Sequence, residues 1–170
     1  AMIKLNLSAL THARAGKKQS FDLDIEAVTV GDLELVQLEG ALHFTRVAGG
    51  ILLTGELTAK AKTDCTRCLA PVLVPIAVEF DDTISLPGAD LTPERPVRVH
   101  EDGWIDLTPL VREYAWLGLP TSPLCSPDCR GICPECGGNR NSGECVCEVS
   151  EHVDPRWEAL RALVDRPAET

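Results

Sequence analysis

The sequence predicts an α+β protein: an antiparallel β-rich platform, shaped as a small sandwich or an open barrel, with one or two short helices and a cysteine-rich C-terminal segment. Three observations carry this prediction. Apolar and polar residues alternate over much of the chain from Ile3 to Phe80, which is typical of half-buried strands. Apolar residues recur at helical spacing after residue 106. Six of the eight cysteines lie between Cys125 and Cys147.

Short strands account for the first part of the chain. Each has the period-two alternation of a strand with one buried face. Gly31-Asp32 predicts a turn between two of them, and Gly49-Gly50 predicts a hairpin. The expected strands are residues 3–7, 21–25, 33–38, 41–47 and 52–63.

The clearest alternation follows the first cysteine pair. Its apolar residues are Val72, Val74, Ile76, Val78 and Phe80. Pro75 falls on the opposite parity, which suits an edge strand or a bulge. Cys65-x2-Cys68 is therefore expected at the tip that joins two antiparallel strands, where a two-thiol turn can project from a rigid platform.

A helix is expected after an acidic, proline-containing linker at residues 81–103. Asp106 or Thr108 can cap it, Pro109 is tolerated in its first turn, and Gly118 ends it. Its expected apolar face consists of Leu107, Leu110, Val111, Tyr114 and Leu117.

A second short helix is expected to start at Asp154 and to end before Pro167. Its apolar stripe is Trp157, Leu160, Leu163 and Val164. We expect Trp157 in the core. The chain then divides into a platform with the first cysteine hairpin (1–104) and a segment with helix, cysteine cluster and C-terminal helix packed on that platform (105–170).

Composition narrows the classes of function. No apolar run approaches the roughly 20 residues that span a bilayer, so we expect no membrane association. Residues 1–6 lack the apolar region and cleavage site of a secretory signal, so we expect a cytoplasmic protein. A net charge of −10 argues against a general nucleic-acid binder, because phosphate neutralisation requires an excess of Lys and Arg.

The cysteines are interpreted as metal ligands, because a reducing cytosol disfavours structural disulfides. Eight thiolates make two complete tetrahedral sets, which predicts two structural zinc ions. Loop closure favours a local site that closes short loops. That local set is Cys133, Cys136, Cys145 and Cys147. The other set joins the hairpin to the C-terminal half and is Cys65, Cys68, Cys125 and Cys129. Two other pairings of the four close pairs remain open.

Motifs in and around the cysteine clusters carry a family resemblance. They are Asp106-Leu107-Thr108-Pro109-Leu110-Val111-Arg112-Glu113, Leu119-Pro120, Pro123-Leu124-Cys125, Asp128-Cys129-Arg130-Gly131-Ile132-Cys133-Pro134-x-Cys136-Gly137, Asn139-x-Asn141, Cys145-x-Cys147, Asp154-Pro155-Arg156 and, upstream, Cys65-x-Arg67-Cys68-Leu69. Together they resemble the YceD family over residues 50–165. The chain departs from the family at Ile132 and Arg140, where the family commonly has Leu.

The YceD family is described as large ribosomal RNA subunit accumulation proteins. The resemblance therefore implies a role in the synthesis, processing or accumulation of 23S rRNA, and a precursor large ribosomal subunit as partner, through either its 23S rRNA or a large-subunit protein. It implies no known enzymatic step, and we expect no small-molecule substrate. The hypothesis is a non-enzymatic assembly factor in which zinc knuckles present a fixed binding surface.

Three arginines lie inside the cysteine motifs: Arg67, Arg130 and Arg140. Clustering the knuckles would concentrate their positive charge despite the acidic whole, which makes them candidate contacts to nucleic acid or to a protein partner. The alternative interpretation is three solvated side chains.

Two other classes of protein compete with this hypothesis. C-P-x-C-G also suits rubredoxin-like iron, so an iron- or thiol-based redox or electron-transfer protein is the alternative, and the colour of the purified protein discriminates the two. A hydrolase or transferase is disfavoured because the sequence has no glycine-rich phosphate loop, no G-x-S-x-G and no H-E-x-x-H. His12, His43, His100 and His152 are scattered, and we expect surface or structural roles for them.

Overall fold

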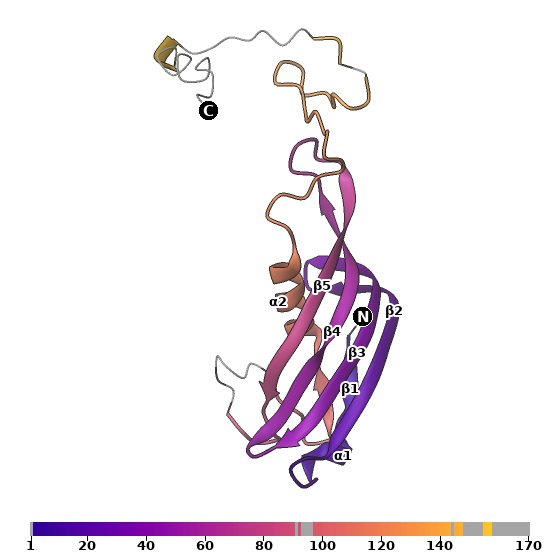
Figure 1. The fold of residues 1–170 in the computed structure, drawn as a ribbon, viewed down its shortest axis with the longest axis vertical. Helices are drawn as coiled ribbons and strands as arrows, with labels where there is room; N and C mark the ends of the chain where they lie inside the picture. Colours follow the sequence, from indigo (N-terminus) through magenta and orange to yellow (C-terminus); the bar gives the residue numbers. More distant parts are fainter. Residues whose placement is uncertain (1, 91, 93–96, 144, 148–154, 158–170) are drawn as a thin grey trace, which may run out of the picture.

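Figure 1 shows the computed structural model of the chain, which describes residues 2–90, 92, 97–143, 145–147 and 155–157. Its elements in chain order are β1 (Lys4–Asn6), α1 (Ser8–Thr11), β2 (Lys18–Val30), β3 (Leu33–Val47), β4 (Gly50–Asp64), β5 (Pro71–Ile84), β6 (Trp104–Asp106), α2 (Thr108–Gly118) and the 3-10 helix η1 (Pro155–Trp157).

Strands β2 to β5 form one antiparallel sheet in sequence order, in which each strand pairs with the next. A second, two-stranded antiparallel sheet joins β1 to β6. The α+β class and the antiparallel platform are therefore confirmed. The larger sheet is open, with β2 and β5 at its edges. At one end of the molecule the β4–β5 hairpin projects beyond its neighbours and meets the cysteine-rich segment (Figure 1).

Three local expectations differ from the structure. The strands expected at residues 33–38 and 41–47 are one strand, β3, which has a register shift between Val36 and Glu39. β5 continues to Ile84, into the segment expected to be linker. β6 was not expected at all. Its three residues form a strand because the distant β1 supplies the backbone partners, a contact that local patterning does not reveal.

Helix α2 lies against the larger sheet (Figure 1) and buries Leu110, Val111 and Ala115. The apolar face was predicted correctly except at Leu117, which is 76% exposed. The helix packs mainly against β5, with fewer contacts to β2, and this orientation turns Ala115 inward and Leu117 outward. Leu107 occupies the N-cap position of α2, which has no side-chain cap hydrogen bond, so the expected cap at Asp106 or Thr108 is wrong. Asp106, one residue earlier, accepts the Thr108 N–H through Oδ1 at 2.9 Å.

Three polar side chains of α2 fix it on the sheet, and one of them is Trp116, whose Nε1 donates to Asp32 Oδ1 at 3.4 Å. The Tyr114 hydroxyl donates to Asp82 Oδ2 on β5 at 2.7 Å. Arg112 pairs with Asp32 in the β2–β3 turn, with its Nη2 2.7 Å from Oδ1. The helix therefore leaves the sheet at a defined point and directs the chain toward the projecting hairpin.

The C-terminal helix is described only as η1, and residues 158–164 of the expected stripe lie outside the described residues. Trp157 is 59% exposed, so its expected place in the core is wrong. The expected division of the chain between residues 104 and 105 stays a prediction, and β6 spans that point. Among the described helices, none is long and apolar enough to cross a membrane.

Candidate metal centres

The structure gathers the eight cysteines into two groups of four, and within each group all sulfur atoms lie within 4.8 Å of one another. The hairpin tetrad consists of Cys65, Cys68, Cys125 and Cys129. The terminal tetrad consists of Cys133, Cys136, Cys145 and Cys147. This is the grouping that loop closure favours over the other two pairings.

The hairpin tetrad has sulfur spacings that suit a tetrahedral ion. The Sγ atoms of Cys65 and Cys129 are 3.7 Å apart, and those of Cys68 and Cys125 are 3.5 Å apart. Four sulfurs around zinc at about 2.3 Å lie about 3.8 Å from one another. Three of the four cysteines are buried, and Cys125 is exposed. The donor set therefore fits one structural ion with all four positions filled by protein.

Backbone contacts close the hairpin tetrad as well. The Thr66 N–H donates to the Pro123 carbonyl at 2.9 Å, and the Ile132 N–H donates to the Arg67 carbonyl at 3.0 Å. Gly131 has a φ of +73°, and a Cβ at this position would lie 3.0 Å from the Arg67 carbonyl oxygen. A glycine is needed here because the two chain segments approach so closely.

The terminal tetrad is built within one loop. The Sγ atoms of Cys136 and Cys145 are 3.6 Å apart. Cys133 is buried, whereas Cys136 and Cys147 are exposed and Cys145 is half-buried. The donor set again fits one four-thiolate ion. Unlike the hairpin tetrad, it draws no ligand from the sheet.

Some thiols in both tetrads lose a proton readily, because the pKa values of Cys65, Cys129 and Cys133 are lowered. Burial raises the pKa of Cys65, but backbone N–H groups, first that of Cys125, outweigh it and bring the pKa to about 6. Backbone N–H groups of Cys136 and Glu135 lower the pKa of Cys133 to about 7. Turns that aim N–H groups at sulfur therefore favour the thiolate, which is the form that binds metal.

Two other thiols in each tetrad hold their protons tightly, because the pKa values of Cys68, Cys125, Cys145 and Cys147 are raised. Contact with the sulfurs of its tetrad, first that of Cys129, raises the pKa of Cys125 to about 12. Contact with the Cys136 sulfur raises the pKa of Cys147 to about 12 in the same way. Four thiolates in one small volume repel one another, so a bound cation is what makes all four stable together.

Asn141 links the two tetrads, and the sequence analysis assigned it no role. Its Nδ2 donates to the Cys129 sulfur at 3.3 Å, and its Oδ1 accepts the Arg130 N–H at 2.8 Å. It belongs to the loop between Cys136 and Cys145, which are ligands of the other tetrad. The signal was present in the Asn139-x-Asn141 motif, but that motif does not reveal which sulfur the amide meets.

The three arginines are exposed, and backbone contacts bring their segments together. Besides the Ile132 and Arg130 bonds above, the Arg140 N–H donates to the Gly131 carbonyl at 3.0 Å. Two exposed apolar residues share these turns: Leu69 is 64% exposed and Ile132 is 43% exposed. We call this set the knuckle surface; it consists of Arg67, Leu69, Arg130, Ile132 and Arg140.

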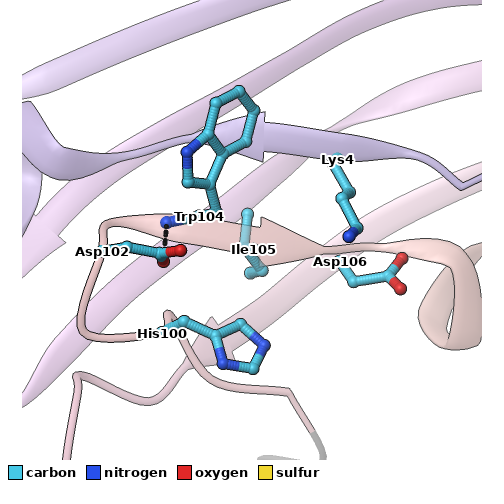
Figure 2. A pocket seen from close by; sticks show the side chains of 6 residues that line it. All are labelled: Lys4, His100, Asp102, Trp104, Ile105 and Asp106. Atoms are coloured by element: carbon cyan, nitrogen blue, oxygen red, sulfur yellow. Dashed lines mark hydrogen bonds between the residues drawn. The ribbon is translucent and has the colours of Figure 1, made fainter.

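The described histidines lie outside both tetrads. His43 Nδ1 is 2.8 Å from Ser20 Oγ on the neighbouring strand. His100 lines an open hollow beside β1 and β6, together with Lys4, Trp104 and Asp106 (Figure 2). His152 lies outside the described residues. The hollow mixes both signs of charge around a half-exposed tryptophan and contains no cysteine.

The fold and the two tetrads define a class of protein: a small α+β scaffold with two four-cysteine sites at one end of an antiparallel sheet. The chain belongs to the YceD family, because the family described as "Large ribosomal RNA subunit accumulation protein YceD" matches residues 53–164. This confirms the resemblance seen in the cysteine motifs and connects the chain with accumulation of large-subunit ribosomal RNA.

Relatives extend the comparison. An uncharacterized protein of Mycobacterium tuberculosis is 30% identical over 100% of this chain and 78% of its own length. The YlbN protein of Bacillus subtilis is 26% identical over 90% of this chain and 93% of its own length. In Zea mays, a chloroplastic protein named large ribosomal RNA subunit accumulation protein YCED homolog 1 is 28% identical over 42% of this chain and 20% of its own length. No solved structure is significantly similar to this chain.

Proposed function

We propose that this protein is a non-enzymatic factor in large ribosomal subunit biogenesis, which supports the synthesis, processing or accumulation of 23S rRNA in the cytoplasm. Membership of the YceD family is the observation that carries the proposal. In this proposal, two metal-stabilised knuckles at one end of the sheet hold the knuckle surface in a fixed shape.

The ions we propose are two structural zinc ions, one in each tetrad. Four thiolates fill a tetrahedral site and leave no position for substrate or activated water. Zinc therefore stabilises the fold here and has no catalytic task. The same sulfur geometry also accepts iron, and the redox alternative depends on that ion. Elemental analysis and the absorption spectrum of chelator-free protein separate the two: zinc gives a colourless protein, and iron gives a red or brown one.

The partner we propose is a precursor of the large ribosomal subunit, contacted through 23S rRNA or a large-subunit protein. Contact runs through Arg67, Arg130 and Arg140 on the knuckle surface. These side chains are exposed, and the hydrogen bonds of their backbones fix them on adjoining turns.

Gradient sedimentation of the tagged protein from growing cells tests the proposal. Wild type should co-sediment with precursor large subunits, and its depletion should lower 23S relative to 16S rRNA. Replacing Arg67, Arg130 and Arg140 by Glu should preserve metal content, because none is a ligand, but should weaken co-sedimentation in a salt-dependent way. Arg67 Nη1 also donates to the Cys129 carbonyl at 3.1 Å. The double variant Arg130→Glu, Arg140→Glu leaves that bond intact and should weaken co-sedimentation as well.

A matched control makes the same change of charge at the opposite end of the molecule. Arg14, Lys17 and Lys18 are exposed near α1 and the start of β2, far from the tetrads in Figure 1. Replacing these three by Glu should leave co-sedimentation unchanged. Wild type that stays at the top of the gradient would remove the main support for the proposal. Equal loss in both triple variants would mean that net charge matters and the knuckle surface does not.

A further inference from the structure

The two Cys-x2-Cys turns have the same backbone hydrogen bonds. In the hairpin turn, the Cys65 N–H donates to the Ala70 carbonyl at 2.8 Å and the Leu69 N–H donates to the Cys65 carbonyl at 2.9 Å. In the terminal turn, the Cys133 N–H donates to the Gly138 carbonyl at 2.8 Å and the Gly137 N–H donates to the Cys133 carbonyl at 2.9 Å. Leu69 and Gly137 therefore occupy equivalent positions.

That position requires the left-handed backbone conformation in both turns. Gly137 has a φ of +71° and Leu69 has a φ of +58°. Glycine adopts this conformation without strain, whereas a residue with a Cβ does so at a cost in free energy. Leu69 gains little from burial in return, because it is 64% exposed. The hairpin turn therefore has an exposed apolar side chain, Leu69, at the position where the terminal turn has Gly137.

The surroundings of Leu69 have the character of a protein interface. The Ile132 side chain is 43% exposed. The Ile132 N–H donates to the carbonyl of Arg67, which is two residues before Leu69. Exposed carboxylates lie close to these arginines in the sequence: Asp64 is three residues before Arg67, and Asp128 is two residues before Arg130. Interfaces between proteins combine an apolar centre with a rim of mixed charge, and arginine is enriched in them.

The same surroundings do not suit RNA. Carboxylates among the arginines repel phosphates, so the surface lacks the uniform positive charge of a phosphate-binding site. Single-stranded RNA is commonly bound by stacking its bases on aromatic side chains. None of the five residues of the knuckle surface is aromatic. The exposed Trp116 lines a hollow with Thr66 and Pro123, which are not part of the knuckle surface.

We infer that Leu69 and Ile132 form the apolar centre of a contact with a protein, rather than with RNA, of the precursor large subunit. The partner presents an apolar side chain bordered by both carboxylate and basic groups, which pair with the arginines and the carboxylates around Leu69. This inference rests on the proposed function and specifies which component of the particle the knuckle surface meets.

The test uses the full chain and precursor large-subunit particles isolated from a gradient. Leu69→Asn removes the apolar side chain, and asparagine tolerates the left-handed conformation. The variant should keep two metals and a melting temperature at or above that of wild type, but should bind the particles about tenfold more weakly. Leu117→Asn is the matched control, because Leu117 is a more exposed leucine on α2; its binding should equal that of wild type.

A crosslink identifies the partner class. With Ile132→p-benzoylphenylalanine, illumination on the particles should give a product of higher mass that survives RNase and contains a ribosomal protein. A product that disappears with RNase would overturn the inference in favour of RNA. Unchanged particle binding by Leu69→Asn would overturn it as well and leave the proposed function standing. Failure of wild type itself to bind the particles would remove both.

Discussion

The hairpin tetrad and the terminal tetrad use the same chemistry on very different lengths of chain. The hairpin tetrad joins sulfurs 64 residues apart, Cys65 and Cys129, and most of its cysteines are buried. The terminal tetrad joins Cys136 to Cys145, 9 residues apart, and is largely exposed. An ion in the first site connects the sheet to the rest of the chain, whereas an ion in the second shapes one loop. Two sites with the same four-thiol composition can therefore stabilise different parts of a fold.

The largest effect is expected from breaking the hairpin tetrad with Cys65→Ser. A structural zinc site contributes on the order of 10 kcal/mol to small domains. Without it the cysteine-rich segment should detach from the β4–β5 tip while the sheet stays folded. Limited proteolysis should then cut between Gly88 and Leu124, and chelation of the wild type should give the same fragments. Continued protection of this stretch after chelation would show that the site does not bridge the two parts.

A smaller effect is expected from Cys136→Ser in the terminal tetrad. Elemental analysis should find two zinc ions in wild type and one in this variant. Its melting temperature should lie closer to that of wild type than to that of Cys65→Ser, because only a local loop loses its ion. Wild type with a single metal per chain would contradict the two-site arrangement on which this comparison depends.

Asn141 tests whether the two sites are independent. Asn141→Ala removes the N–H that points at the Cys129 sulfur, and loss of such a contact typically lowers metal affinity 10- to 100-fold. Competition with a chromophoric chelator should show this loss at the hairpin tetrad when Cys136→Ser is also present, so that only one site is measured.

The matched variant for this position is Asn141→Asp. It keeps an oxygen for the Arg130 N–H but cannot donate to the sulfur. It should lose zinc affinity as Asn141→Ala does. Wild-type affinity in Asn141→Asp would mean that the contact with Arg130, and not the one with sulfur, is what matters.

The smallest effect is expected within the platform, from Tyr114→Phe. Burial and the hydrogen bond to the Asp82 carboxylate raise the pKa of Tyr114 to about 12. The pKa of a tyrosine in the unfolded chain is about 10. The contribution of the Tyr114–Asp82 hydrogen bond to the free energy of unfolding is therefore fully present below pH 10 and is lost as the pH rises to 12. Denaturant titrations at pH 8 should show that the free energy of unfolding of Tyr114→Phe is about 1 kcal/mol lower than that of wild type.

The Tyr114 contact joins α2 to β5 and involves neither tetrad. The loss in Tyr114→Phe should therefore be the same in chelated and zinc-loaded protein. A loss that appears only in loaded protein would mean that the platform and the hairpin tetrad are coupled.

The features that depend on local pattern could be predicted from the amino-acid sequence. Period-two alternation marked each of the four long strands, with β2 expected only at residues 21–25 and β3 expected as two strands. The spacing of Leu110 and Val111 placed α2 on the sheet. The distances between cysteines identified two turns, and the count of eight thiols limited the sites to two. The motifs around the cysteines identified the family. Each of these signals is carried by residues close together in the chain, because backbone geometry fixes what neighbours can do.

Which distant segments of the chain meet could be seen only in the folded molecule. β6 exists because β1 lies beside it, and Leu117 faces solvent because β5 meets another side of the helix. The choice among three groupings of cysteine pairs, the contact of Asn141 with sulfur and the left-handed Leu69 all depend on how the hairpin tip receives the C-terminal half. Side-chain periodicity records only whether a residue is buried. The partner that buries it is set by packing between elements far apart in the sequence.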